Sequence, residues 1–418
     1  MEGAPAQLTA EILGRLSPPS RTYPLEHRRS FDGCAHPAPA FRELCGFAHS
    51  NLDGHPSRPN IVFIMIESFR AQEIGALGGE IAEGNPATPS LTPRFDALAA
   101  RAILFRNFYG NGFQTRHGLV ASYCSIFPNT GRPILGAYQN VKEHCLADVL
   151  AGRGYKTLWL HGGDADFDGQ RDFLLHNGFQ RVMDRWDFPL NAPTVGWGVT
   201  DEALFDRAIA EFRALPQPFF ASLLTITNHH PFEVPPGFAK HGSDEYGRFL
   251  DTMAYTDRAL GEFFEKARSE AFFKNTVFFI YADHSVPQPS ATAVKDVRED
   301  LTWRHRIPLL IVANGLQGRV VDAPGSQVDL PPLVMDLLGG QAEVPWEGQS
   351  PVNGQDSQPA LVVHPGNYIG ILEPHGAAKW SRGTWTESGL VDPRKKQWAE
   401  DITLVTRWAL ENDRVAVP

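Results

Sequence analysis

Polar side chains suited to metal and phosphoryl chemistry stand directly after four of the chain's apolar runs. The runs are RPNIVFIMI, KTLWLHGG, FFASLLTIT and NTVFFIYA, and the residues that follow them are Glu67 and Ser68, Asp164, Asn228 to His230, and Asp283 with His284. In an open α/β sheet, the carboxyl ends of the strands meet at the edge where ligands bind. Because carboxylates and imidazoles bind divalent cations such as Mn²⁺ and Zn²⁺, the pattern indicates a metal site at that edge.

A possible nucleophile stands in the segment GNGFQTRHGLVASYCSIFP (110–128). Thr115 follows a glycine-rich turn and precedes a run typical of a helix, so it could be an ordinary N-cap. It could instead join one Glu, one Asp and one His as a metal ligand, since a bound cation lowers the pKa of a hydroxyl and makes it nucleophilic at neutral pH. Each cluster alone could be a cap, a solvated turn or a structural histidine pair. Their occurrence together favours a metal-activated threonine.

The elements that must position these residues alternate along the chain. Apolar runs predict buried strands, and amphipathic patterns predict helices between them. The expected strands are 58–68, 156–163, 219–230, 275–284 and 307–315, and the expected helices are 90–102, 201–215 and 251–269. This alternation predicts a three-layer α/β/α fold around a largely parallel sheet.

We divide the chain into three parts. Residues 1–57 form an N-terminal arm or linker with one short helix near 7–16, and residues 58–345 form the catalytic domain. Residues 346–418 form a smaller C-terminal α+β subdomain, in which short strands at 361–372 precede a closing helix at 393–413.

Composition restricts the class of protein. A length of 418 residues suits one large α/β domain with additions. The 38 Lys and Arg against 48 Asp and Glu give a net charge of −10 without a basic run, which argues against a nucleic-acid partner. No segment reaches the roughly 18 apolar residues of a membrane span, and MEGAPAQLTAEILGRLSPPSR lacks the pattern of a signal peptide. We therefore expect a chain that is soluble as given, with a domain separated from a membrane anchor as the alternative.

The four cysteines leave two interpretations open. Their positions, Cys34, Cys45, Cys124 and Cys145, fit neither a zinc ribbon nor a CxxC redox pair. Cys34 and Cys45 could form a local disulfide in an exported protein, or all four could be unpaired thiols, because the compartment decides pairing.

Seven motifs occur in an order that resembles the lipoteichoic acid synthase-like family of the alkaline phosphatase–sulfatase superfamily. They are PNIVFIMIES, NGxxTxxG, LHGGDADFDGQRDFLLHNGF, TITNHHPF, YADH, RIPLLI and PGSQVDLPPLVMDLLG, and they cover about residues 58–345. The family includes polyglycerolphosphate synthases and phosphoglycerol transferases that modify periplasmic glucans. The resemblance implies an alkaline phosphatase/sulfatase-like fold. It also implies phosphoglycerol transfer from a lipid such as phosphatidylglycerol to a hydroxyl acceptor, either a glycan or glycerolphosphate.

The resemblance also implies roles for particular residues. One Mn²⁺, with Zn²⁺ or Mg²⁺ as alternatives, would be held by Glu67, Thr115, Asp283 and His284, and Thr115 would carry a phospho-threonine intermediate. The candidates for substrate contacts are His229, Arg171, Arg116, Asp168 and His305. His305 equally fits a structural role at a strand start. The family further implies a periplasmic or extracytoplasmic location at the inner membrane, for a domain excised from an anchored parent.

Other functions stay open on the sequence. Ser285 stands where the family often has Gly, and Gly169 and Gln170 precede Arg171 where some members have a Trp, so the glycerolphosphate pocket is not fixed. A sulfatase activity is disfavoured, because CSIFP (124–128) lacks the Pro and Arg of the formylglycine pattern. A phosphodiesterase or phosphonate hydrolase, a phosphoethanolamine transferase and a non-catalytic module that binds lipid head groups are the alternatives. Stoichiometric metal would argue against the last of these.

Overall fold

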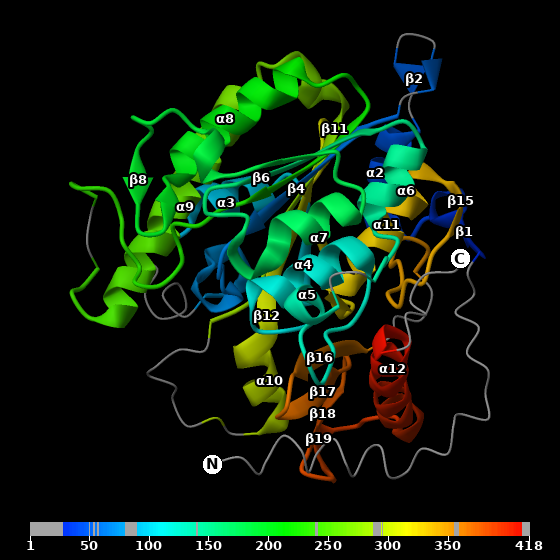
Figure 1. Cartoon of the computed structure of the whole chain (residues 1–418). Helices are drawn as coiled ribbons and strands as arrows, with labels where there is room; N and C mark the ends of the chain where they lie inside the picture. The colour runs from blue at the N-terminus through cyan, green and yellow to red at the C-terminus, as the bar shows by residue number, and fades with distance from the viewer. Residues whose placement is uncertain are drawn as a thin grey trace.

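A nine-stranded sheet forms the centre of the computed structural model (Figure 1), which describes residues 28–49, 51–52, 55–56, 58–79, 90–138, 141–238, 241–286, 294, 296–354 and 359–411. The helix expected near 7–16 lies outside these ranges. The strand order is β13 (Arg319–Val321), β5 (Ile103–Tyr109), β12 (Arg306–Val312), β11 (Thr276–Ala282), β4 (Asn60–Ile66), β10 (Phe219–Leu224), β6 (Lys156–His161) and β7 (Arg181–Met183), with β14 (Gly325–Ser326) beside β5.

The sheet is parallel except at one strand. β12 runs antiparallel to both of its neighbours, β11 and β5, while the other pairings are parallel. Every residue of β4, β10 and β11 is buried, which explains why these strands appear in the sequence as unbroken apolar runs. β5 was not expected, because exposed Arg106 and half-buried Asn107 interrupt its apolar pattern.

Helices cover both faces of this sheet, as the expected three-layer fold requires (Figure 1). On one face α9 (Glu245–Ala267) packs against α8 (Asp201–Ala214) and α3 (Pro93–Ala99). On the other face α4 (Thr115–Cys124) contacts α5 (Ile134–Ala137), α6 (Leu146–Gly152) and α11 (Leu330–Leu338), and α7 (Gln170–His176) lies beside β7. The helices expected at 90–102, 201–215 and 251–269 correspond to α3, α8 and α9. In the part of the chain that the structure describes, no helix is long and apolar enough to cross a membrane.

The segments at both ends pack on this body. β1 (Arg28–Phe31) pairs antiparallel with β15 (Gly340–Glu343), and α2 (Arg42–Ala48) contacts α11. β16 (Ala360–His364), β17 (Tyr368–Leu372), β18 (Gly376–Ser381) and β19 (Thr384–Gly389) form an antiparallel sheet against which α12 (Pro393–Glu411) packs. The remaining elements are short: α10 (Val297–His305) precedes β12, and β2 (Asn51–Leu52) and β8 (Thr194–Val195) form hairpins with β3 (His55–Pro56) and β9 (Gly198–Val199). The division of the chain at residues 57 and 345 stays a prediction.

All four cysteines are paired. Cys34 is bonded to Cys45, and Cys124 to Cys145. The local pair is the one that the sequence allowed, and the second pair joins the end of α4 to the start of α6.

A buried carboxyl group makes stability depend on pH. Glu143 is fully buried, and its Oε2 accepts a hydrogen bond from Asn177 Nδ2 (2.6 Å), while its Oε1 has no hydrogen-bond partner in the part of the chain that the structure describes. Burial raises the pKa of Glu143 to about 8. The protonated carboxyl group of Glu143 is therefore the form that the folded state favours. Its contribution to stability is fully present below the unfolded-state pKa of about 4.3 and is lost as the pH rises towards 8.

We therefore expect Glu143→Gln to raise the free energy of unfolding at pH 8 relative to wild type, by on the order of 1–3 kcal/mol, and to change it little at pH 4.5. Urea unfolding at both pH values measures the difference. Glu233→Gln, at an exposed position, changes the net charge equally and serves as the control. An equal shift in both variants, or none at pH 8, would contradict this assignment.

Candidate active site

Three of the expected metal ligands converge at the carboxyl edge of the sheet. β4 and β11 are adjacent and parallel, with Ile66 opposite Ala282, so the residues that follow each strand, Glu67 and Asp283, come together. His284 Nε2 lies 3.5 Å from Glu67 Oε1 and 3.5 Å from Asp283 Oδ2. One ligand atom from each of the three residues lies within 4.8 Å of the others. His284 Nδ1 contacts the backbone oxygen of Ser285 (3.1 Å), which orients Nε2 towards the carboxylates.

The surroundings of Asp283 suit a cation. Its Oδ1 accepts hydrogen bonds from the backbone nitrogens of Ser68 and His284 (both 2.8 Å), while its buried Oδ2 has no hydrogen-bond donor among the described residues. Burial, and then the charge of Glu67, raise the pKa of Asp283 to about 7. Burial alone would lower the pKa of His284, but Asp283 and Glu67 raise it overall. The site thus offers two buried carboxylates, one of them with an oxygen that lacks a donor, and one imidazole. Mn²⁺ and Zn²⁺ bind such a set of ligands, so these residues fit the expected metal.

Thr115 stands beside this cluster at the first position of α4. Its Oγ1 lies 3.3 Å from Glu67 Oε2 as a hydrogen-bond donor. The N-cap position belongs to Gln114, and the cap has no side-chain hydrogen bond. Thr115 is therefore not the N-cap, and that alternative is wrong. The start of a helix carries partial positive charge, which suits an anionic group bound next to Thr115.

A close backbone contact sets the position of this helix. Gly118, one turn after Thr115, lies directly against Asp283. A Cβ added at Gly118 would overlap the carbonyl oxygen of Asp283 and stand 2.9 Å from its carbonyl carbon. Only the absence of a side chain lets α4 approach the metal ligand so closely.

A pocket of about 940 Å³ opens in front of Thr115. Of the other expected substrate contacts, His229, Arg116 and Asp168 line it. Arg116 is held by Gln114 Oε1 (2.6 and 2.9 Å) and has a long contact of 3.8 Å with Asp168. The ring of His229 lies against that of Trp197, with centroids 4.4 Å apart.

Arg171 and His305 lie elsewhere. Arg171 does not line the pocket, since its guanidinium bonds to Asp166 Oδ1 (2.7 Å) and to the buried Asp184 Oδ2 (2.6 Å). The structure therefore does not bring Arg171 together with the pocket-lining candidates, and its contact with substrate stays a prediction. His305 is buried, with Nδ1 at Gly110 O (3.2 Å) and Nε2 at Tyr368 Oη (2.9 Å), as its structural alternative requires. Burial lowers its pKa to about 4.

Arg185 and Trp197 are among the pocket-wall residues that the sequence did not single out. Arg185 lines the pocket and donates from Nη1 to the backbone oxygen of Trp197 (2.8 Å). Trp197 lines it from the β8–β9 hairpin with 49% of its surface exposed. An aromatic residue between two glycines in TVGWGV was the available signal, but no periodic pattern connects this hairpin with the strand-end clusters.

The chain is similar to known proteins in sequence and in fold. A family model described as Sulfatase matches residues 59–340. The chain belongs to the sulfatase family. Phosphoglycerol transferase I of Xanthomonas euvesicatoria pv. vesicatoria is 30% identical over 71% of the chain and 44% of that protein. The lipoteichoic acid synthase-like protein YvgJ of Bacillus subtilis is 25% identical over 74% of the chain and 52% of that protein.

A solved structure of an alkaline phosphatase superfamily protein from Vibrio parahaemolyticus has a TM-score of 0.74 and 26% identity, covering 91% of the chain and 97% of that structure. The expected fold and the resemblance to lipoteichoic acid synthases and phosphoglycerol transferases are thus confirmed. The chain of this sulfatase-family protein spans about half the length of the curated relatives it matches. The family name describes the fold and does not establish sulfate ester hydrolysis.

The contact between α4 and Asp283 gives a direct test of the site. We expect Gly118→Ala to lower kcat at least tenfold and to weaken binding of Mn²⁺, because the added methyl group pushes Thr115 and Asp283 apart. Turnover of a phosphodiester and calorimetric titration with Mn²⁺ measure both effects. Gly46→Ala in α2, where a Cβ meets nothing within 4 Å, is the matched control. Normal metal affinity and kcat in Gly118→Ala would show that the close approach is not required.

Proposed function

We propose that the protein is a metal-dependent phosphoglycerol transferase with Thr115 as its nucleophile. One observation carries the proposal: the Thr115 hydroxyl donates to Glu67, which clusters with Asp283 and His284, and the buried Oδ2 of Asp283 has no donor among the described residues. A divalent cation held by Thr115, Glu67, Asp283 and His284 would lower the pKa of the Thr115 hydroxyl and offset the negative charge of the phosphoryl oxygens. Mn²⁺ is the first candidate, and Zn²⁺ and Mg²⁺ are the alternatives.

The reaction proceeds by two displacements at phosphorus. Thr115 Oγ1 loses its proton and attacks the phosphodiester of a lipid such as phosphatidylglycerol. The Oγ1–P bond forms, the bond to the diacylglycerol oxygen breaks, and that oxygen leaves with a proton as a hydroxyl group. An acceptor hydroxyl then attacks the phospho-threonine, gives up its proton, and releases Thr115 Oγ1 as a hydroxyl. Arg116 and His229 contact the transferred group from the pocket wall, and the start of α4 favours its negative charge.

The paired cysteines support an extracytoplasmic location. Two disulfides, Cys34–Cys45 and Cys124–Cys145, are typical of proteins that fold in an oxidising compartment. A lipid donor would bring the pocket to a membrane surface there.

The outer wall of the pocket favours a neutral acceptor. Asp164, Asp166 and Asp168 all line it and offer hydrogen-bond acceptors, while Arg171 offsets the charge of Asp166 and Arg116 lies 3.8 Å from Asp168, so the wall carries no excess positive charge to bind a glycerolphosphate chain. Trp197 and Phe167, 49% and 56% exposed, present aromatic faces beside these carboxylates. An aromatic face together with hydrogen-bond acceptors suits a hydroxyl-rich glycan, which can stack and donate hydrogen bonds without adding charge.

The nucleophile is tested by mass spectrometry of the peptide that contains Thr115, after brief incubation of the Mn²⁺-loaded protein with phosphatidylglycerol and phosphatidylethanolamine. We expect a glycerophosphate adduct on Thr115, absent in Thr115→Ala and in Asp283→Ala. A phosphoethanolamine adduct would keep the mechanism and change the substrate. No adduct in the metal-loaded protein would overturn the transferase, and turnover by Thr115→Ala would overturn the nucleophile.

The acceptor is tested at Trp197. Trp197→Ala should raise the KM for a neutral oligosaccharide acceptor by about tenfold, since it removes one stacking face worth on the order of 1 kcal/mol or more. Hydrolysis of a small diester, which needs no acceptor, should change less than twofold. Trp408→Ala, exposed on α12, is the control. Equal losses in both assays would remove Trp197 from the acceptor site.

A further inference from the structure

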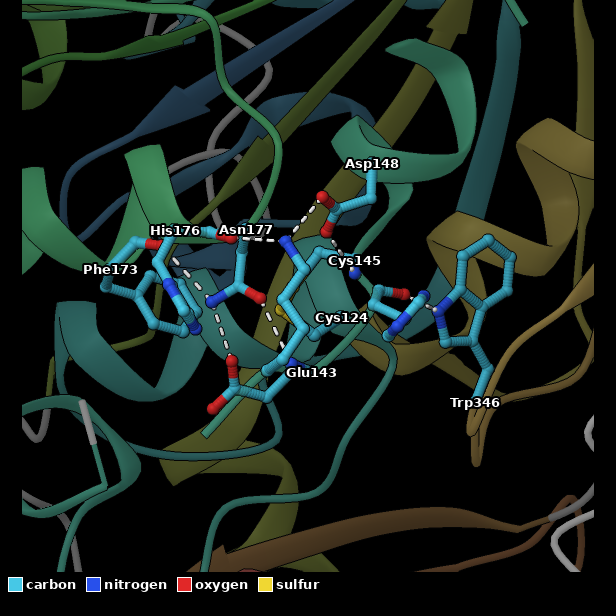
Figure 2. Close-up of a disulfide and its surroundings, with 10 residues drawn as sticks. Cys124, Glu143, Cys145, Asp148, Phe173, His176, Asn177 and Trp346 are labelled. Carbon is cyan, nitrogen blue, oxygen red and sulfur yellow. Dashed lines mark hydrogen bonds and ion pairs between the residues drawn. A yellow bond between two sulfur atoms is a disulfide. The ribbon is translucent and has the colours of Figure 1, made fainter. Parts of the chain in front are cut away.

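The helix that carries Thr115 is fastened at its opposite end by a disulfide. Thr115 is the first residue of α4 and Cys124 is the last. Cys124 is bonded to Cys145, which directly precedes α6, and both cysteines are buried (Figure 2). The bond therefore connects the nucleophile's helix covalently to a second helix that does not line the pocket.

The Cys145 side of this bond is firmly held, as Figure 2 shows. The backbone nitrogen of Cys145 donates to Asp148 Oδ2 (3.1 Å), and the neighbouring carbonyl of His144 accepts from Trp346 Nε1 (2.9 Å). Glu143 and Asn177 form two hydrogen bonds. The backbone nitrogen of Glu143 donates to Asn177 Oδ1 (3.1 Å), and Asn177 Nδ2 donates to Glu143 Oε2 (2.6 Å). The disulfide thus ties α4 to a segment that has its own network of contacts.

The geometry of α4 transmits a movement of Cys124 to Thr115. Gly118 presses on Asp283 between the two residues and acts as a pivot. At about 1.5 Å per residue, Cys124 lies about 9 Å beyond Gly118 and Thr115 about 4.5 Å before it. A turn of the helix about Gly118 therefore displaces Thr115 by about half the displacement of Cys124. Catalytic groups need placement within about 0.5 Å, so a shift of about 1 Å at the disulfide matters.

Non-covalent contacts hold the same end of the helix. Tyr123 Oη and Ser222 Oγ lie 2.6 Å apart, and Ser125 Oγ donates to Val328 O (2.6 Å). These contacts keep α4 folded against the sheet when the disulfide is removed, but they do not fix its direction, so the expected result is a looser helix and not an unfolded one.

We propose that Cys124 and Cys145 are positioning residues for phosphoryl transfer: their disulfide fixes the direction of α4 and so holds Thr115 Oγ1 at Glu67. The expected effect on phosphoryl transfer rests on the proposed function. The expected effect on the position of Thr115 does not, because the affinity for Mn²⁺ also measures it.

The second disulfide supplies a matched control. Cys34–Cys45 closes a separation of 11 residues and Cys124–Cys145 one of 21, so their removal should cost comparable stability. The first pair lies in the segment next to α11, and neither of its cysteines lines the pocket.

The experiment compares two double variants of the full chain at saturating Mn²⁺. The first carries both Cys124→Ala and Cys145→Ala, and the second carries both Cys34→Ala and Cys45→Ala. Both should lower Tm by similar amounts. Only the first should lower kcat three- to tenfold with KM for phosphatidylglycerol within twofold, weaken Mn²⁺ binding, and speed hydrogen exchange at residues 115–118. Wild-type kcat and Mn²⁺ affinity in the first variant, or equal losses in both, would overturn the proposal.

Two further arms separate the possible failures. If wild type transfers nothing from either lipid, the proposed function fails, and Mn²⁺ affinity and hydrogen exchange still decide the role of the disulfide. If the Cys124 and Cys145 variant does not fold, folded Cys34→Ala with Cys45→Ala is reduced by dithiothreitol. The remaining disulfide becomes two thiols while the reagent is oxidised to its cyclic disulfide. Unchanged kcat and Mn²⁺ affinity after complete reduction would also overturn the proposal.

Discussion

Two carboxylates forced together in the interior are the constraint on which the site depends. Glu67 and Asp283 follow adjacent parallel strands in register, so the backbone cannot separate them without breaking the sheet. Burial and mutual repulsion raise the pKa of Asp283, and one of its oxygens lacks a donor. A protein gains nothing in stability from such an arrangement without a compensating positive charge. The fold accepts this cost at one edge, and the nearby hydroxyl of Thr115 is the group that a cation there would activate.

The one antiparallel strand explains how distant segments reach that edge. Because β12 runs opposite to its neighbours, its start lies where the other strands end, and His305 meets Gly110 just after β5. The C-terminal sheet then supports the same turn: Asn111 Nδ2 donates to Leu361 O (2.6 Å), and Val363 N donates to Asn111 O (2.7 Å). The C-terminal strands therefore fix the turn that leads into Thr115, although they supply no residue of the pocket wall.

The sequence predicted those features for which a local pattern, such as an apolar run, could be combined with a general rule of topology, such as the position of ligand sites at strand ends. The buried strands were recognisable as unbroken apolar runs, and the rule for strand ends brought Glu67, Asp283 and His284 together. Where tertiary contacts decide, the sequence offered no guide. Arg171 follows the motif spacing of a substrate-binding arginine, yet the buried Asp184 from a different loop takes its guanidinium. The pairing of Cys124 with Cys145 likewise depends on how α4 and α6 pack, which no spacing rule encodes.

The inner and outer parts of the pocket differ in what they can discriminate. In the proposed mechanism the residues near Thr115 act on the phosphoryl group, which all phosphodiester donors share, so this part determines the chemistry and not the substrate. Farther out, the Trp197 hairpin and the carboxylates of the 164–168 segment present a shape and charges that can distinguish one acceptor from another. They lie outside helix α4, so the proposed acceptor site can change without moving Thr115.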